Sequence, residues 1–363
     1  MAGALDGVTI VEMAGLGPGP FAAMMLADHG ARVIRVERPG NLAVPNDPLT
    51  RNRESIALDL RKEAGRELVR RLVSQADGLV EGYRPGVMER LGLGPDRLLA
   101  DNPRLVYGRI TGWGQSGPLS QEAGHDINYL ALTGLLSCIG EADRPAAVPL
   151  NLVADYGGGG LMLAFGMVAG LLAAQRTGEG QVIDAAMTDG AALTGALIYG
   201  LRAAGLWQDR RQSNLLDGGD PIYGCYFCAD GREVAVGAME PQFRAALYEG
   251  LDLPPGADRA TIAARFATRP RDQWLALFAG KDACVAPVLG LGEAPDHPHN
   301  RERGTFIEVG GVAQPGPAPR LQGTPSPPPR APREEGADGA LILAELGLSN
   351  AEIASLRDEK VLL

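Results

Sequence analysis

The chain has 363 residues, enough for two domains or one large one, and its 45% hydrophobic and 21% charged residues are typical of an ordinary globular protein. Its 34 basic residues are outnumbered by 44 acidic ones, and the net charge of −10 argues against a nucleic-acid-binding protein. The 4 cysteines are too few for a disulfide scaffold of this size.

Residues 1–186 alternate between short apolar segments and longer segments with helical periodicity. This alternation predicts an α/β fold, with a Rossmann-like parallel sheet covered by helices on both faces. We expect strands at 7–13, 32–38, 55–60, 77–83, 105–113 and 180–187, and helices at 21–31, 62–76, 86–94, 94–102, 127–140 and 190–205.

The second half of the chain changes in character and predicts a smaller α+β domain. A hairpin is expected around residues 223–237, with Cys225 and Cys228 facing opposite ways. This C-x-x-C has no second pair at zinc spacing, so we expect no metal site. The final helix should be amphipathic, with Ser349 as an N-cap. We therefore predict a large domain at 1–186 and 330–363, a small domain at 225–308, and linkers at 187–224 and 309–329.

Targeting and membrane signals are weak. The first residues lack the basic segment followed by a long apolar stretch that marks a signal peptide. Residues 157–174 are uncharged but short for a membrane span, which needs about 20 apolar residues. We interpret them as a buried core helix and expect a cytoplasmic protein.

The sequence GLGPGP at Gly15–Pro20 lies between a predicted strand and a predicted helix. It fails the G-x-G-x-x-G spacing of dinucleotide-binding turns, so a nicotinamide cofactor is not expected. We interpret it as a tight turn whose backbone closely approaches a ligand.

Histidines are few, which narrows the search for an acid–base residue. His29 is expected at a helix C-terminus, and His297 and His299 in a polar loop where metal binding is weakly supported. His125 stands between a glycine-rich loop and a helix, where a catalytic side chain can be presented. It is either a catalytic residue or a residue of that loop that has no catalytic role.

Asp155 precedes Tyr156 and four consecutive glycines, Gly157–Gly160, and lies near the start of the apolar helix. A simple N-cap would explain the aspartate. Four glycines in a helix cost about 1 kcal/mol each, and capping does not require them. The alternative is that free N–H groups and bare backbone form a site for developing negative charge.

At these residues the sequence resembles the type III CoA-transferase superfamily, and within it the α-methylacyl-CoA racemases. The resemblance covers nearly the whole chain and is carried by several long motifs in order, among them GRITGWGQSGP, AGHDINY, NLVADYGGGG, GQVIDAAMTDG and DACVAPV. It implies an interlocked homodimer, a CoA thioester substrate and no required metal or redox cofactor.

The resemblance also implies roles for individual residues. His125 and Asp155 match the acid–base pair, Glu240 the carboxylate that bonds the histidine from the partner chain, and Asn151 the side chain that orients the aspartate. Residues expected to contact CoA are Arg38, Leu58, Leu60, Arg61, Tyr83, Arg84, Arg90, Gly124, Asp126 and Tyr129.

Two further expectations concern the ligand. Related racemases often carry lysine where this chain has Arg61, so the charge is kept but the phosphate geometry differs. The acyl group is expected to lie against Leu16, Ile222 and Met239.

These assignments favour racemisation at C2 of 2-methylacyl-CoA thioesters through an enolate, with its oxygen near backbone N–H groups beside Asp155. Burial should raise the pKa of Asp155. The main alternative is CoA transfer with Asp155 as a nucleophile and a mixed anhydride as intermediate. A non-enzymatic CoA-binding dimer is a third possibility.

Overall fold

The computed structural model describes residues 3–38, 40, 44 and 46–363. The chain forms two compact units, one from residues 1–133, 150–194 and 304–363, and a second from residues 134–149 and 195–303. Each unit is described separately below.

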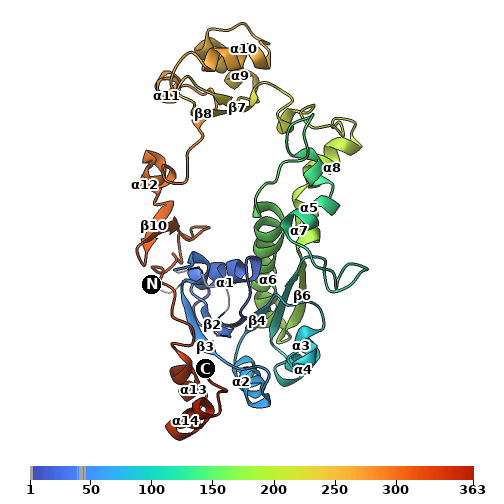
Figure 1. Ribbon diagram of the computed structural model, residues 1–363, viewed down its shortest axis with the longest axis vertical. Coiled ribbons are helices and arrows are strands. Elements are labelled where there is room, and N and C mark those ends of the chain that lie inside the picture. Colours follow the sequence, from blue (N-terminus) through green and yellow to red (C-terminus); the bar gives the residue numbers. More distant parts are fainter. Residues whose placement is uncertain (1–2, 39, 41–43, 45) are drawn as a thin grey trace. The chain divides into compact units, whose positions relative to one another are not determined.

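The first unit is built on a parallel sheet of six strands, which confirms the predicted α/β class (Figure 1). The strand order β3-β2-β1-β4-β5-β6 is that of a Rossmann-like sheet. Because the order reverses between β1 and β4, a crevice is expected outside the carboxyl ends of these two strands. The strands are β1 (Thr9–Met13), β2 (Arg32–Glu37), β3 (Arg53–Ala57), β4 (Gly78–Glu81), β5 (Val106–Thr111) and β6 (Gln181–Ala186).

Helices cover both faces of this sheet (Figure 1). One face carries α1 (Pro18–Asp28) and α6 (Leu161–Thr177), which pack against each other. The opposite face carries α2 (Glu63–Ser74), α3 (Val87–Arg90) and α4 (Pro95–Asp101), together with the C-terminal helices α13 (Gly339–Glu345) and α14 (Asn350–Asp358). Its buried core joins strand and helix side chains, including Val11, Ile34, Leu79, Leu68, Leu72, Leu98, Leu343 and Ile353.

Several predicted helices are each two shorter elements. The segment 127–140 forms α5 (Asp126–Leu132) and the 3-10 helix η2 (Leu135–Cys138), separated by Gly134 at φ 74°. The segment 190–205 forms α7 (Met187–Thr194) and α8 (Ala196–Ala203). The final helix is likewise divided, because Gly347 at φ 88° ends the first part, and Ser349 caps the second as predicted.

The second unit has an antiparallel sheet of β7 (Tyr223–Phe227), β8 (Glu233–Gly237) and β9 (Val285–Pro287). Three helices complete its core: α9 (Pro241–Leu251), α10 (Arg259–Phe266) and α11 (Arg271–Phe278). The expected hairpin is confirmed, with Cys225 exposed and Cys228 buried. The 3-10 helices η4 (Leu215–Asp217) and η5 (Ala294–Asp296) and the helix α12 (Pro298–Arg303) also belong to this unit.

The compact units differ in extent from the domain ranges expected from sequence. Residues 134–149 and 195–224 group with the second unit, and residues 304–329 group with the first. This last segment contains the hairpin β10 (Phe306–Val309) and β11 (Val312–Pro315). It is attached by a buried contact, since Arg51 Nη1 donates to Gln314 Oε1 at 2.8 Å while Arg51 also pairs with Asp28.

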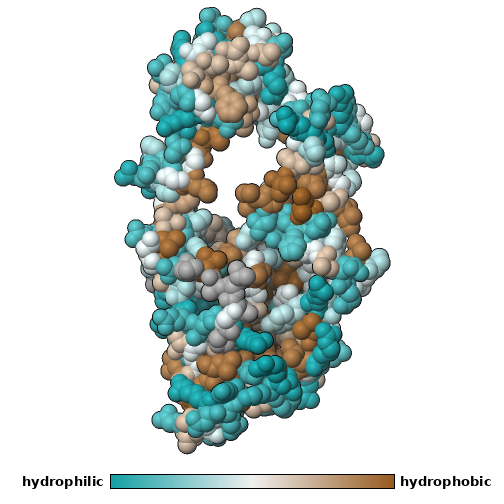
Figure 2. Space-filling model, in the orientation of Figure 1, coloured by the Kyte–Doolittle hydropathy of each residue, from teal (hydrophilic) through white to brown (hydrophobic). Residues whose placement is uncertain are grey.

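The helical stretch Leu152–Thr177 is, by length and composition alone, long and apolar enough to cross a membrane, and half of its most apolar window is buried in the chain. Leu163, Met167 and Leu171 pack inward in α6, which lies against β5 and β6. The expected core helix is therefore buried on one face only. The other face exposes Leu161, Phe165, Val168 and Leu172, and Figure 2 shows hydrophobic surface gathered over this region and the neighbouring α5 and α7.

Glycines allow the helices around Asp155 to pack closely. A β-carbon at Gly190 of α7 would lie 1.8 Å from the carbonyl oxygen of Gly158, and one at Gly158 would lie 2.3 Å from the Ala191 nitrogen. A β-carbon at Gly160 would meet Phe21 of α1 at 2.6 Å. The consecutive glycines thus admit neighbouring segments of the chain itself.

Gly190→Ala is predicted to lower the free energy of unfolding by about 3 kcal/mol, because the added methyl group overlaps backbone. The matched control is Gly200→Ala, since among the described residues no atom outside its own helical turn lies within 4 Å of a β-carbon at that position. The control should raise stability by about 0.5 kcal/mol. Urea unfolding followed by circular dichroism measures both, and equal stability of the two variants would contradict the packing described.

Candidate functional site

Asp155 lies on an unusually wide helical turn. It belongs to the π-helix η3 (Leu152–Gly160), which continues directly into α6. π-Helical turns are rare and occur frequently at functional sites. Asn151 Nδ2 donates to Asp155 Oδ2 at 3.3 Å, so the residue expected to orient the aspartate does contact it.

The surroundings of Asp155 raise its pKa. Burial is the largest cause, because it disfavours the charged carboxylate, and the negative charge of Asp126 acts in the same direction. The hydrogen bond from Asn151 and the proximity of His125 act in the opposite direction but are outweighed. The expected raised pKa is confirmed.

His125 is the N-cap residue of α5, with extended backbone angles of φ −136° and ψ 175°. Its backbone N–H donates to Asn128 Oδ1 at 3.1 Å, which fixes the start of the helix, and its imidazole is exposed. The following residue, Asp126, is buried, and its Oδ2 accepts the N–H groups of Ala154 at 2.7 Å and Asp155 at 2.8 Å. The structure therefore brings His125 and Asp155 into one neighbourhood.

This arrangement corrects two expectations about negative charge at the aspartate. The N–H groups of Ala154 and Asp155 already donate to Asp126, so they are not free to receive an enolate oxygen. Gly158 and Gly160 accommodate the packing of α7 and α1 rather than a ligand. The sequence could not reveal either point, because both depend on which helices meet.

The GLGPGP segment forms a tight turn beside Asp155, while its predicted approach to a ligand stays a prediction. Gly17 adopts φ 68° as the N-cap of α1, and Pro18 opens the helix. A β-carbon at Gly17 would lie 3.8 Å from Asp155 Oδ2. The bare backbone of this turn therefore faces the candidate catalytic carboxylate.

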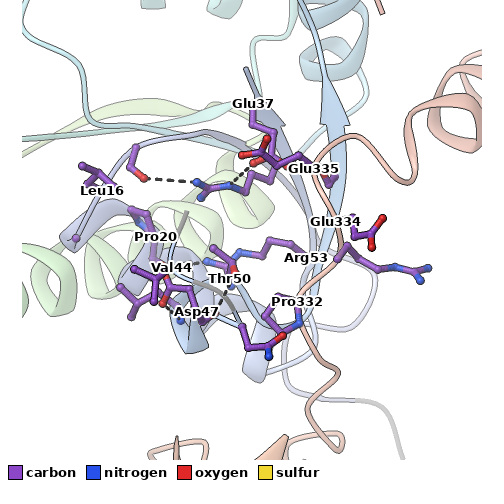
Figure 3. A pocket seen from close by; sticks show the side chains of 17 residues that line it. Leu16, Pro20, Glu37, Val44, Asp47, Thr50, Arg53, Pro332, Glu334 and Glu335 are labelled. Carbon is purple, nitrogen blue, oxygen red and sulfur yellow. Dashed lines mark hydrogen bonds and ion pairs between the residues drawn. The ribbon is translucent and has the colours of Figure 1, made fainter. Parts of the chain in front are cut away.

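Gly17 and Leu16 also line a cavity of about 710 Å³ (Figure 3). The cavity is apolar along Leu16, Pro20 and Val44. Charged residues also line it, where Arg35 bonds to Glu37 at 3.2 Å and to the Gly15 carbonyl at 3.5 Å. Leu16 is 73% exposed, and its contact with an acyl group stays a prediction.

A second cavity, of about 230 Å³, lies beyond the carboxyl ends of β1 to β4. It is lined by five of the residues expected to contact CoA: Arg38, Leu58, Leu60, Arg61 and Tyr83.

Asp59 also lines this cavity and was not predicted from sequence. Arg61 donates to it through two hydrogen bonds, Nε to Oδ1 and Nη2 to Oδ2, both at 2.8 Å. The bonded guanidinium lowers the pKa of Asp59 to about 2. Asp59 thus fixes the direction of Arg61. Its signal in the sequence was only its position two residues before a predicted contact residue.

Arg38 and two other predicted CoA contacts, Arg84 and Arg90, are exposed, and within the described part of the chain none of the three forms an ion pair with a carboxylate. Ion pairs made by the buried Arg109 support the segment that carries Arg84 and Arg90. Arg109 bonds to Glu81 at 2.8 Å and to Glu89 at 2.7 Å. These arginines therefore keep their charge available for phosphate.

Gly124 and Tyr129 form a packed corner beside the site. The Tyr129 hydroxyl donates to the Gly124 carbonyl, and its ring meets Trp113 edge-on at 4.8 Å between centroids. A β-carbon at Gly124 would lie 2.7 Å from the Tyr129 ring. Asp126 is likewise occupied by its backbone contacts, so these three predicted CoA contacts have structural partners within the chain.

The remaining predicted residues belong to the second unit. Ile222 is 0% exposed in that unit's core, so its predicted contact with an acyl group is wrong for this structure. Met239 is 37% exposed, and Glu240 is exposed as the N-cap residue of α9. The role of Glu240 stays a prediction.

Comparison with known proteins decides the family. The family model for CoA-transferase family III matches residues 5–338. The chain belongs to CoA-transferase family III.

Relatives within and around this family cover almost the full chain. The α-methylacyl-CoA racemase of Mus musculus is 46% identical over 98% of this chain and 97% of its own length. The α-methylacyl-CoA racemase of Homo sapiens is 45% identical over 99% of this chain and 97% of its own length. The crystal structure of a CaiB/BaiF family protein from Brucella suis superposes with a TM-score of 0.83, at 27% identity, over 95% of this chain and 100% of that one.

For this family member, Arg38→Ala is predicted to weaken CoA binding about tenfold, because one charge-assisted hydrogen bond to phosphate is lost. Isothermal titration calorimetry with CoA measures the effect. Arg97→Ala is the control, since Arg97 lies on α4, pairs with Asp101 at 3.0 Å and does not line the cavity. Unchanged affinity in Arg38→Ala would contradict the placement of CoA at this cavity.

Proposed function

We propose that this protein is an α-methylacyl-CoA racemase, an isomerase that inverts C2 of 2-methylacyl-CoA thioesters. The observation that carries the proposal is the identity of 45–46% to two racemases over nearly the full chain. The site supports it, because a histidine and a carboxyl with a raised pKa are held together by Asp126. These residue types suit a reaction in which one group removes a proton and another returns one.

The proposed reaction is a 1,1-proton transfer. His125 or Asp155 removes the proton from C2, the C2–H electron pair moves into the thioester to form an enolate, and the other residue delivers a proton to the opposite face. The two residues exchange roles with the handedness of the substrate. The raised pKa of Asp155 supports its acid role, because a carboxyl must hold its proton near the working pH to act as an acid.

The enolate oxygen requires donors other than the N–H groups bound by Asp126. Within the described residues, no acceptor is found for the backbone N–H groups of Asp126 and Ile127 at the start of α5. These groups lie directly after His125 and are the first orphan donors of a helix. We assign them to the enolate oxygen.

The CoA part of the substrate is proposed to occupy the cavity lined by Arg38, Arg61 and Tyr83, while the acyl part lies against Leu16. CoA enters as part of the substrate, and the proposed chemistry requires no metal or redox cofactor. The proposed location is the cytoplasm.

CoA transfer is the alternative within this family. There, ionised Asp155 would attack the thioester carbonyl, expel CoA thiolate and form a mixed anhydride. A non-enzymatic CoA-binding protein is the third possibility. Racemisation is favoured by the proximity of His125, because the transfer mechanism has no evident need for an imidazole there.

The proposal predicts that the enzyme in D₂O incorporates deuterium at C2 from either epimer of a 2-methylacyl-CoA. His125→Ala should reduce exchange from one epimer by about 100-fold and from the other far less, because Asp155 remains as a base. Proton NMR of each pure epimer measures both rates.

Absence of deuterium at C2 with the wild-type enzyme would refute racemisation. Hydroxylamine trapping of an acyl group on Asp155, together with transfer of CoA between acids, would instead indicate the transferase. Binding of CoA esters with neither reaction would indicate the non-enzymatic protein.

We further propose that the protein is an interlocked homodimer in which the partner's Glu240 supports His125. The exposed apolar residues of α6 follow one another at spacings of four, three and four and so lie along one helix face. We infer that a second copy of the chain covers this face. In a chain with net charge −10, so large an apolar face is unusual without a partner.

Phe165→Glu is predicted to shift the protein toward monomer and to reduce activity, because it places a charge in the proposed interface. Size-exclusion chromatography with light scattering measures the mass, starting from a wild-type mass of twice the 38.0 kDa chain. Gln175→Glu, at an exposed polar position of the same helix, is the control. A wild-type protein of monomeric mass would contradict the dimer.

A further inference from the structure

The Asp126 side chain connects the two segments that carry His125 and Asp155. It is 4% exposed, and its Oδ2 accepts N–H groups from Ala154 and Asp155. Asp126 is also the first residue of α5 and follows His125 directly. One buried carboxylate therefore links both sides of the candidate acid–base pair.

We propose that Asp126 is a positioning residue for proton transfer, whose carboxylate holds the Asp155 backbone in place beside His125. The inference rests on the proposed racemase function and deepens it, since it names a residue that acts through another. The carboxylate faces protein backbone in this role, and the contact with CoA expected for Asp126 stays a prediction.

Ordinary helix capping does not account for this contact. The N-cap residue of η3 is Asn151, and its side chain makes no capping hydrogen bond but instead donates to Asp155. The cap is supplied by α5, 28 and 29 residues earlier in the sequence. Capping from another helix fixes the distance between the two helices as well as satisfying the N–H groups.

Burying the charged carboxylate of Asp126 also costs desolvation energy that a neutral capping side chain would not. Asp126 Oδ1 is buried and has no hydrogen-bond partner within the described residues. A buried carboxylate with an unsatisfied oxygen is destabilising, and a neutral side chain could cap these N–H groups with less desolvation. The charge therefore points to a role in the site.

That role is electrostatic. The titratable groups that interact with Asp155 are Asp126, His125 and Tyr129, all from α5 or its N-cap position. Among them Asp126 supplies the negative charge that adds to burial in raising the pKa of Asp155. Its charge thus favours the protonated form of Asp155, and its hydrogen bonds hold the Asp155 backbone in place.

Two variants separate these effects. Asp126→Ala removes both, and kcat should fall by about 100-fold with KM within about threefold, because the reacting groups lose alignment after substrate binding. Asp126→Asn keeps an oxygen that can accept the N–H groups and removes the charge, so kcat should fall about tenfold or less. Deuterium exchange at C2 of 2-methylacyl-CoA measures both.

The pH profile supplies a readout that a purely structural role would not move. Asp155 acts as a base only when ionised, so activity in that direction rises with pH through its pKa. Removing the Asp126 charge lowers this pKa. The rising limb of the pH–activity profile should therefore move to lower pH in Asp126→Asn. The control is Asp77→Asn, because Asp77 also accepts a backbone N–H, that of Thr9 at 2.8 Å, at the opposite end of β1.

The inference would be overturned if Asp126→Asn kept the wild-type kcat and the wild-type pH profile. It would also be overturned if both variants lost kcat equally and the pH profile did not move. Thermal unfolding and circular dichroism identify variants that do not fold, and Asp126→Asn carries the test if Asp126→Ala is one. Failure of the proposed function is a different result, since wild-type protein would then exchange no deuterium.

Discussion

Inverting a carbon atom by proton transfer requires two groups of suitable pKa on opposite sides of that atom. Rigid backbone holds such groups in position better than flexible side chains do. In the reaction proposed for this protein, that constraint rests on two hydrogen bonds, from the N–H groups of Ala154 and Asp155 to Asp126. They join the start of α5 to the π-helix before α6. The close contact between Gly158 and Gly190 holds the same helix against α7, so the position of Asp155 is fixed from two sides.

The sheet explains why the ligand cavities lie where they do. The strand order reverses between β1 and β4, where a crevice is expected at the carboxyl ends. The turn after β1 lines both cavities, and the segment after β4 lines the smaller one. Arg38 and Arg61 belong to segments after β2 and β3, while Gly17 after β1 reaches Asp155. In the proposed function, the phosphates of the ligand lie at these arginines and its reactive carbon at His125 and Asp155.

The fold class and the hairpin were predictable because the alternation of apolar segments depends on neighbouring residues. The resemblance selected His125 and Asp155, which the structure brings together, and Asn151, which contacts the aspartate. Sequence patterns could not show that Ile222 is enclosed in a core or that the glycines after Asp155 receive α1 and α7. Those facts depend on contacts between distant segments. The contact of Asp59 with Arg61 was missed for the same reason, and Asp126 was predicted only as a CoA contact.

The most direct measurement of the central claim is a crystal structure with a stable analogue of a 2-methylacyl-CoA bound. The account predicts that C2 of the acyl group lies between the His125 imidazole and the Asp155 carboxyl, each within about 3.5 Å and on opposite faces. The phosphates should lie at Arg38 and Arg61. A structure in which C2 is out of reach of either side chain would contradict the account.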